Sequence, residues 1–248
     1  MTIGVGFVCG NGLVIGADRK VTNPDEYTFE EQKVDAIAWA NGAAIWSYSG
    51  NPDTAKNVRA ELQSRFAAHS TVFRRDIKKQ IQEVLRACLN KGERFNMLYG
   101  AQTKNEAYIL LMATTDKIAE VDKCEIIGGG DSSLSRYLRG LILNLPFPPL
   151  IDQAVIAATY IIQQAKRYDG HYCGGATDVY ALDFDGFTHV TDQWQAERWE
   201  RELKQLEFES AVLFATLTAK GVEEDRIENA LKTHAEIVRQ FCAKVRGS

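Results

Sequence analysis

Short apolar runs separated by turn residues dominate the first fifty positions of the chain. Two of them, Val5–Cys9 and Leu13–Ala17, flank a Gly-Asn-Gly segment that contains the Asn-Gly pair favoured in tight hairpin turns. This pattern predicts an antiparallel hairpin. Because its strands run in opposite directions, the hairpin would bring Thr2, before the first strand, and Asp18, after the second, to the same end of a sheet.

Strand and helix patterns alternate along the rest of the chain. Apolar runs between glycine-containing turns indicate strands, and apolar residues three or four positions apart indicate helices. The predicted strands are Val34–Ala40, Ala43–Tyr48, Arg94–Ala101, Ala107–Ala113, Ile118–Val121, Glu125–Ile127, Val179–Phe184 and Phe187–Val190. The first predicted helix begins at Pro52, and the second, whose apolar stripe starts at Ile77, ends at Lys91-Gly92. Two more helices are predicted at Leu134–Ile142 and Ile151–Lys166. The segment from Gln193 onward is also predicted to be helical, and Gly221 divides it into a helical hairpin.

Length and composition favour one globular domain. The chain has 248 residues, of which 45% are hydrophobic, and this is enough for one large core. A formal net charge of −4 argues against a sequence-independent nucleic-acid binder, which would need a clustered basic surface. No run approaches the roughly 18 apolar residues of a membrane span, and the N-terminus lacks the pattern of a secretion signal. We therefore expect a cytoplasmic protein that binds neither nucleic acid nor membranes.

Cysteine and histidine positions indicate neither a disulfide framework nor a metal site. The cysteines are odd in number and lie far apart, and the histidines lack metal-ligand spacing. We expect no metal and no organic cofactor. The cysteines are Cys9, Cys88, Cys124, Cys173 and Cys242, and the histidines are His69, His171, His189 and His234.

Thr2 is a candidate nucleophile. It follows Met1, and a residue as small as threonine permits a methionine aminopeptidase to remove that methionine. Removal would leave a free α-amine on the residue that carries the hydroxyl. An α-amine has an ordinary pKa of about 8, so this amine would be a built-in general base for the neighbouring hydroxyl.

The N-terminal segment resembles the start of mature proteasome β-type subunits and of their bacterial relatives. The resemblance lies in Thr-Ile-Gly-Val-Gly-Phe-Val, a glycine-containing turn, and Leu-Val-Ile-Gly-Ala-Asp-Arg-Lys-Val-Thr. The motif positions of that family read here as Thr2, Gly12, Asp18 and Lys33. The spacing from Thr2 to Asp18 agrees residue for residue, whereas Lys33 arrives one residue early, which a short deletion in the loop Asn23–Glu31 would explain.

The resemblance implies a fold and a mechanism. The fold is a four-layer αββα sandwich of the N-terminal-nucleophile hydrolase type at residues 2–190, and this chain adds a helical extension at 193–246. In the mechanism, Thr2 attacks an amide carbonyl, Lys33 assists as a cation, and Asp18 holds Lys33 by a charge-assisted hydrogen bond. The backbone N–H of Gly50, in a Ser-Gly turn, would stabilise the oxyanion.

Two supporting motifs of the family are altered in this sequence. Where the family has Gly-Ser-Gly, this chain has three glycines, so that Gly129 takes the serine position and Asp131 or Ser132 would have to supply the missing support. In the Asp-x-x-Ser-Gly-Gly motif, Cys173 replaces the serine and Asp169 lies one residue too far upstream. A thiol donates a weaker hydrogen bond than a hydroxyl, and we interpret Cys173 as a structural replacement for the serine and not as a nucleophile.

The function that this reading predicts is threonine-type cleavage of peptides or unfolded proteins. The family encloses its sites in rings, so we expect a homo-oligomeric ring, while the residues do not indicate whether an ATPase partner exists. Two alternatives stay open. One is a noncatalytic subunit that keeps the sandwich for assembly, and the other is acyl transfer to an amine, which uses the same acyl-enzyme.

Overall fold

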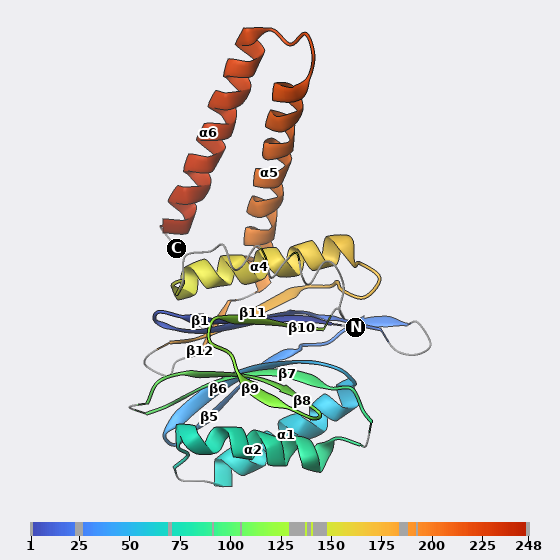
Figure 1. The fold of residues 1–248 in the computed structure, drawn as a ribbon, viewed down its shortest axis with the longest axis vertical. Coiled ribbons are helices and arrows are strands. Elements are labelled where there is room, and N and C mark those ends of the chain that lie inside the picture. The colour runs from blue at the N-terminus through green and yellow to red at the C-terminus, as the bar shows by residue number, and fades with distance from the viewer. Residues whose placement is uncertain are drawn as a thin grey trace. The chain divides into compact units, whose positions relative to one another are not determined.

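The computed structural model describes residues 2–22, 27–68, 71–90, 92–104, 106–128, 137, 140, 148–183, 188–191 and 193–246. The chain forms two compact units, Met1–Ala196 and Glu197–Ser248. The first unit is an α+β sandwich in which two antiparallel sheets are stacked between helices (Figure 1). This confirms the predicted fold class. Of the predicted helix at Leu134–Ile142 the structure describes only residues 137 and 140, both helical, and the predicted turn at Asp185-Gly186 lies outside the described residues.

The first sheet is built around the N-terminal hairpin. Its strand order is β10-β1-β2-β11-β12, and every neighbouring pair is antiparallel. Gly4 pairs with Ala17 in the register of the hairpin, which brings the start of β1 beside the end of β2, as the sequence predicts. The strands are β1 Ile3–Cys9, β2 Gly12–Asp18, β10 Cys124–Gly128, β11 Thr177–Asp183 and β12 Thr188–Thr191.

The second sheet has the strand order β5-β6-β7-β8-β9, again antiparallel throughout. The two sheets share a buried core to which β2 contributes Leu13 and Ile15, and the second sheet contributes Ile45 and Leu98. Because β2 is covered on both faces, it is buried along its whole length and reads as a continuous apolar run. The strands are β5 Val34–Trp39, β6 Gly42–Ser49, β7 Asn96–Thr103, β8 Ile109–Thr114 and β9 Ile118–Glu120.

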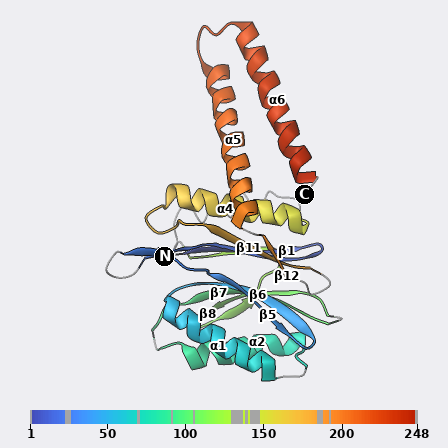
Figure 2. The ribbon, with the colours of Figure 1, turned by 180° about the vertical axis from the view of Figure 1, so that it is seen from behind.

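Helices cover the outer face of each sheet. The helices α1 (Pro52–Ala68) and α2 (Arg74–Cys88) pack on the second sheet, and α4 (Ile151–Tyr168) packs on the first (Figure 2). The start of α1 follows the expected chemistry: proline holds its first position, and the Asn51 side chain accepts the backbone N–H of Asp53 at 2.9 Å.

Two local predictions differ from the structure. Part of the loop predicted at Asn23–Glu31 is a short hairpin strand, because β4 (Thr28–Glu30) pairs with β3 (Lys20–Thr22). Strands of three residues are too short to show an alternating pattern. The second difference is that α2 ends at Cys88, before the glycine that was expected to stop it, since Leu89 already has an extended backbone and caps the helix.

The second unit is the helical hairpin that the sequence predicts. It contains most of α5 (Gln193–Thr218) and all of α6 (Glu224–Arg246). Gly221 lies in the connection with a φ of 76°, where a side chain would be strained. Trp199 and Phe241 make an edge-to-face contact at 6.0 Å between ring centroids, and Lys244 pairs with Glu202 at 2.6 Å. Among the described helices, none is long and apolar enough to cross a membrane.

Candidate active site

The carboxylate of Asp18 joins three separate parts of the chain. Asp18 ends β2 and is completely buried. Its Oδ1 accepts the backbone N–H of Ile3 at 3.1 Å and the ammonium of Lys33 at 3.1 Å, and its Oδ2 accepts the backbone N–H of Gly174 at 3.0 Å. These donors come from the start of β1, the residue before β5 and the loop after α4. A buried carboxylate with three donors is electrostatically satisfied and fixed in position.

Lys33 is the cation of this site. Its side chain is only 1% exposed, and its Nζ donates to the backbone carbonyl of Lys20 as well as to Asp18. Burial lowers the pKa of Lys33 below its ordinary value, and the neighbouring Asp18 carboxylate opposes this shift without cancelling it. The Asp18 carboxylate thus favours the charged form of Lys33, which burial alone would disfavour.

Thr2 lies directly beside this ion pair. It is buried, and the peptide N–H that follows it, on Ile3, is bound to the same Oδ1 atom that binds Lys33. The structure therefore brings together Thr2, Asp18 and Lys33, the three residues that the sequence identified as candidate catalytic residues. Thr2 immediately precedes β1 in the first sheet, and the ammonium reaches this corner from the edge of the second sheet.

Gly128 has a role that was not predicted. It pairs with Ile3 in the sheet and has a φ of 80°, and a Cβ added to it would overlap the carbonyl oxygen of Thr2. Only glycine fits this position. The signal in the sequence is the run of three glycines that begins at Gly128. The comparison with the Gly-Ser-Gly motif concerns only the second of them, Gly129. Gly129, Asp131 and Ser132, the predicted supporting residues of that turn, lie outside the described residues.

Gly50 lies next to the same corner of the molecule. It follows β6, whose last residue, Ser49, has its Oγ 3.0 Å from the point where a Cβ on Gly128 would be. A Cβ on Gly50 would approach the ring of Phe95 to 2.8 Å and the carbonyl of Arg94 to 3.0 Å. The backbone of Gly50 can therefore lie this close to its neighbours only because it carries no side chain.

Cys173 and Asp169 belong to the loop that follows α4. Cys173 is buried, and burial raises the pKa of its thiol to about 12. A thiol with this pKa stays protonated near neutral pH and is a poor nucleophile, which agrees with a structural role. Asp169 caps α4 and accepts the backbone N–H of Cys173 at 2.9 Å through its own carbonyl oxygen. The described contact of Asp169 with the site is thus made by its backbone.

Two basic residues without a predicted role hold this loop and the strand β11 that follows it in place. Arg19 binds Asp178 through both carboxylate oxygens, with distances of 2.6 Å and 2.9 Å. Lys20 donates its Nζ to the carbonyl of Gly170 at 2.7 Å and its backbone N–H to the carbonyl of Gly174 at 3.0 Å. Their position directly after Asp18 is the only signal in the sequence. Among the described residues, no group of His, Cys, Asp and Glu could hold a metal ion.

The stacked sheets and their helices define the fold of the proteasome-like N-terminal-nucleophile hydrolases. Solved structures of Anbu (ancestral beta-subunit) proteins share it. The structure from Yersinia bercovieri is 16% identical with a TM-score of 0.69, and the match covers 89% of this chain and 99% of that chain. The structure of an Anbu (Gly-1) mutant from Hyphomicrobium sp. strain MC1 is 15% identical with a TM-score of 0.67, and the match covers 83% of this chain and 97% of that chain. A helical assembly of the Anbu complex from Pseudomonas aeruginosa is a third match. It is 15% identical with a TM-score of 0.64, and the match covers 82% of this chain and 92% of that chain.

These neighbours correct the family expected from the sequence. The resemblance to proteasome β-type subunits and the bacterial proteasome homologue is corrected, because the solved structures described above are Anbu proteins, which form a related branch. No protein-family model matches the chain, and no curated protein matches its sequence. At 14–16% identity, the structural likeness establishes the fold and not the reaction.

Proposed function

We propose that this chain is an amide hydrolase whose nucleophile is the hydroxyl of Thr2, once the peptide bond between Met1 and Thr2 has been cleaved. The observation that carries the proposal is the shared carboxylate oxygen of Asp18, which binds the ammonium of Lys33 and the peptide N–H next to Thr2. This geometry supports a cation held beside a candidate N-terminal hydroxyl. The proposed substrates are peptides or unfolded protein segments.

The proposed reaction needs only the groups of this corner of the molecule. The neutral α-amine of Thr2 takes the proton of the Thr2 hydroxyl while the oxygen attacks the amide carbonyl carbon. The backbone N–H of Gly50 donates to the resulting oxyanion. The C–N bond then breaks, the leaving amine takes the proton from the α-ammonium, and an ester to Thr2 remains. Water attacks this ester, the α-amine takes and returns its proton, and the carboxylic acid leaves.

Lys33 contributes in two ways to this scheme. As a cation it disfavours a second positive charge on the nearby α-amine, which keeps that amine available as a base. It also stabilises negative charge that develops on the hydroxyl oxygen. Asp18 holds the ammonium for both tasks, so Asp18 is a positioning residue and the carboxylate does not touch the substrate.

We further propose that the chain associates with copies of itself. The support is the helical assembly of the Anbu complex from Pseudomonas aeruginosa, together with large apolar side chains exposed on the C-terminal hairpin of this chain. Self-association would restrict access to an open peptidase site.

Two forms of the same protein test the catalytic proposal. One begins at Thr2, produced by a protease that cuts before that residue, and the other retains Met1, with intact mass verifying both. We expect peptide hydrolysis only from the form that begins at Thr2, and none from a Thr2→Ala variant prepared in the same way. Equal activity in both forms would refute the N-terminal mechanism. An added amine acceptor distinguishes hydrolysis from acyl transfer by the mass of the product, and folded but inactive protein would favour the noncatalytic alternative.

A further inference from the structure

The last nine residues of α5, Ser210–Thr218, carry no charge. The uncharged run continues to Ala219, directly after the helix, and has no Asp, Glu, Lys or Arg. Side chains of this run are nevertheless exposed, including Phe214 at 69%, and Phe208, which precedes the run, is 65% exposed. The hydroxyls of Ser210, Thr216 and Thr218 in this run donate to backbone carbonyls of the same helix. A contiguous exposed apolar surface marks an interaction site. This part of the hairpin therefore needs a covering partner.

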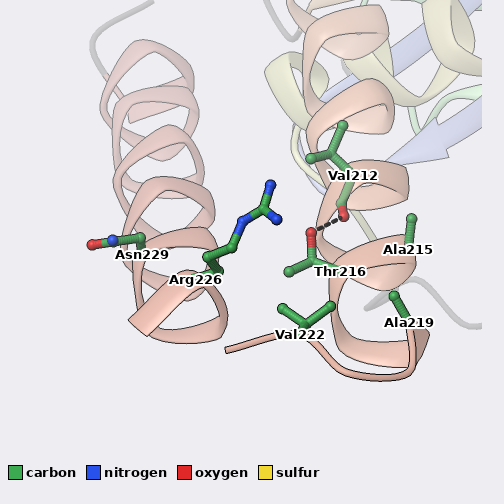
Figure 3. A pocket seen from close by; sticks show the side chains of 7 residues that line it. All are labelled: Val212, Ala215, Thr216, Ala219, Val222, Arg226 and Asn229. Atoms are coloured by element: carbon green, nitrogen blue, oxygen red, sulfur yellow. Dashed lines mark hydrogen bonds between the residues drawn. The ribbon is translucent and has the colours of Figure 1, made fainter. Parts of the chain in front are cut away.

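A pocket opens between α5 and α6 in the same region. It has a volume of about 640 Å³, and small or apolar side chains supply most of its lining. Arg226 reaches from α6 into the space between the helices, toward Thr216 of α5 (Figure 3). The hydroxyl of Thr216 is already used, since it donates to the carbonyl of Val212 at 2.9 Å. The remaining lining residues are Ala215, Ala219, Val222 and Asn229.

Arg226 is the charged residue in the lining of this pocket. The ion pairs that the described residues of α6 form join Lys232 to Glu228, Arg239 to Glu236 and Lys244 to Glu202, and none of them includes Arg226. A guanidinium at the edge of an apolar pocket matches a carboxylate that stands next to a large apolar side chain. The chain contains that combination in α5, where Phe208 stands between Glu207 and Glu209.

We propose that this pocket is the docking site for Phe208 of a second copy of the chain, with Glu209 of that copy pairing with Arg226. The proposal deepens the self-association proposed above and rests on it. Phe208 and Ala215 are seven residues apart, about two helical turns, so the aromatic ring and the pocket lie on the same side of α5. Two hairpins packed antiparallel about a two-fold axis beside Val212 would each insert Phe208 against Thr216 of the other. The four helices would then bury the uncharged run.

Two matched phenylalanine variants test the docking site in the full-length protein. Phe208→Glu is expected to reduce the assembly to smaller species, measured by light scattering across a concentration series. Phe214→Glu adds the same charge to an equally exposed position, but six residues are roughly 1.7 turns, so Phe214 faces away from the pocket and its variant is expected to keep the wild-type mass. Circular dichroism verifies that both variants fold.

The outcomes distinguish failure of the docking site from failure of self-association. A wild-type assembly that both variants leave intact, or that both disrupt, would overturn the docking site and leave self-association standing. A wild-type protein that is monomeric at every concentration would overturn self-association and the docking site together. Neither result bears on Thr2, whose hydrolysis is measured separately.

Charge reversal tests the proposed ion pair. Arg226→Glu alone is expected to weaken the assembly about tenfold or more in dissociation constant, and adding Glu209→Arg to the same chain is expected to restore most of the loss. A double variant no better than Arg226→Glu would refute the pairing. In a Cys242→Ala background, Val212→Cys is further expected to form a disulfide-linked dimer with an added oxidant, whereas Phe214→Cys is not. Equal cross-linking of both would contradict the two-fold arrangement.

Discussion

Replacement of Lys33 by methionine tests whether the buried ion pair exists as the structure has it. Methionine has a similar length and no charge, so the substitution removes the ammonium with little change in volume. It leaves the Asp18 carboxylate, which is completely buried, with only the backbone donors of Ile3 and Gly174. It also leaves the carbonyl of Lys20 without the donor that Lys33 supplied.

The cost follows from these contacts. Breaking a buried pair by removing one partner costs about 3–5 kcal/mol, and the two remaining donors favour the lower end, about 3 kcal/mol. The lost bond to the Lys20 carbonyl adds about 1 kcal/mol, so we expect Lys33→Met to lose about 4 kcal/mol. Asp18→Asn is expected to lose about 3 kcal/mol, because it leaves the ammonium unpaired. The double variant leaves no buried charge and is expected to lose about 4 kcal/mol, less than the sum.

Urea unfolding followed by tryptophan fluorescence and circular dichroism measures these free energies. A surface pair of similar length provides the control, since Lys232 lies 2.8 Å from Glu228 with both side chains exposed. Lys232→Met is expected to cost about 0.5 kcal/mol or less. Losses of Asp18→Asn and Lys33→Met that simply add in the double variant would refute the reasoning, because residues that interact directly must show a coupling energy.

Three further predictions follow from single positions. Gly128→Ala is expected to destabilise the protein by several kcal/mol and to displace Thr2, whereas Gly92→Ala, at a similar φ of 84° but with nothing within 4 Å of the added carbon, is expected to cost only about 1 kcal/mol. Iodoacetamide at pH 8 is expected to modify the exposed Cys242 in the folded protein and to leave Cys173 unmodified until urea is added, as peptide mass mapping would detect. Because burial raises the pKa of Cys173 from 9.0 to about 12, its contribution to stability is complete below pH 9 and lost as the pH rises toward 12, so Cys173→Ala should flatten the alkaline decline measured by thermal unfolding.

Local patterns in the sequence are enough to predict the N-terminal hairpin and much of the candidate site. A Gly-Asn-Gly turn fixes the register of its two strands, and the register decides which residues meet at the open end. For that reason, the proximity of Thr2 and Asp18 was predictable from local patterns alone. The helical hairpin was predictable on the same basis, because apolar spacing and Gly221 mark its two arms and its turn.

How these pieces meet depends on packing between segments that lie far apart in the sequence. The third donor to Asp18 is the N–H of Gly174, 156 positions away in the sequence, and the ammonium of Lys33 is buried only because the two sheets stack. The close approach of Gly128 to Thr2 depends on the pairing of β10 with β1, which no local pattern specifies. Hydrophobic spacing encodes the contacts of a residue with its neighbours along the chain, whereas burial and electrostatic partners depend on packing between distant segments.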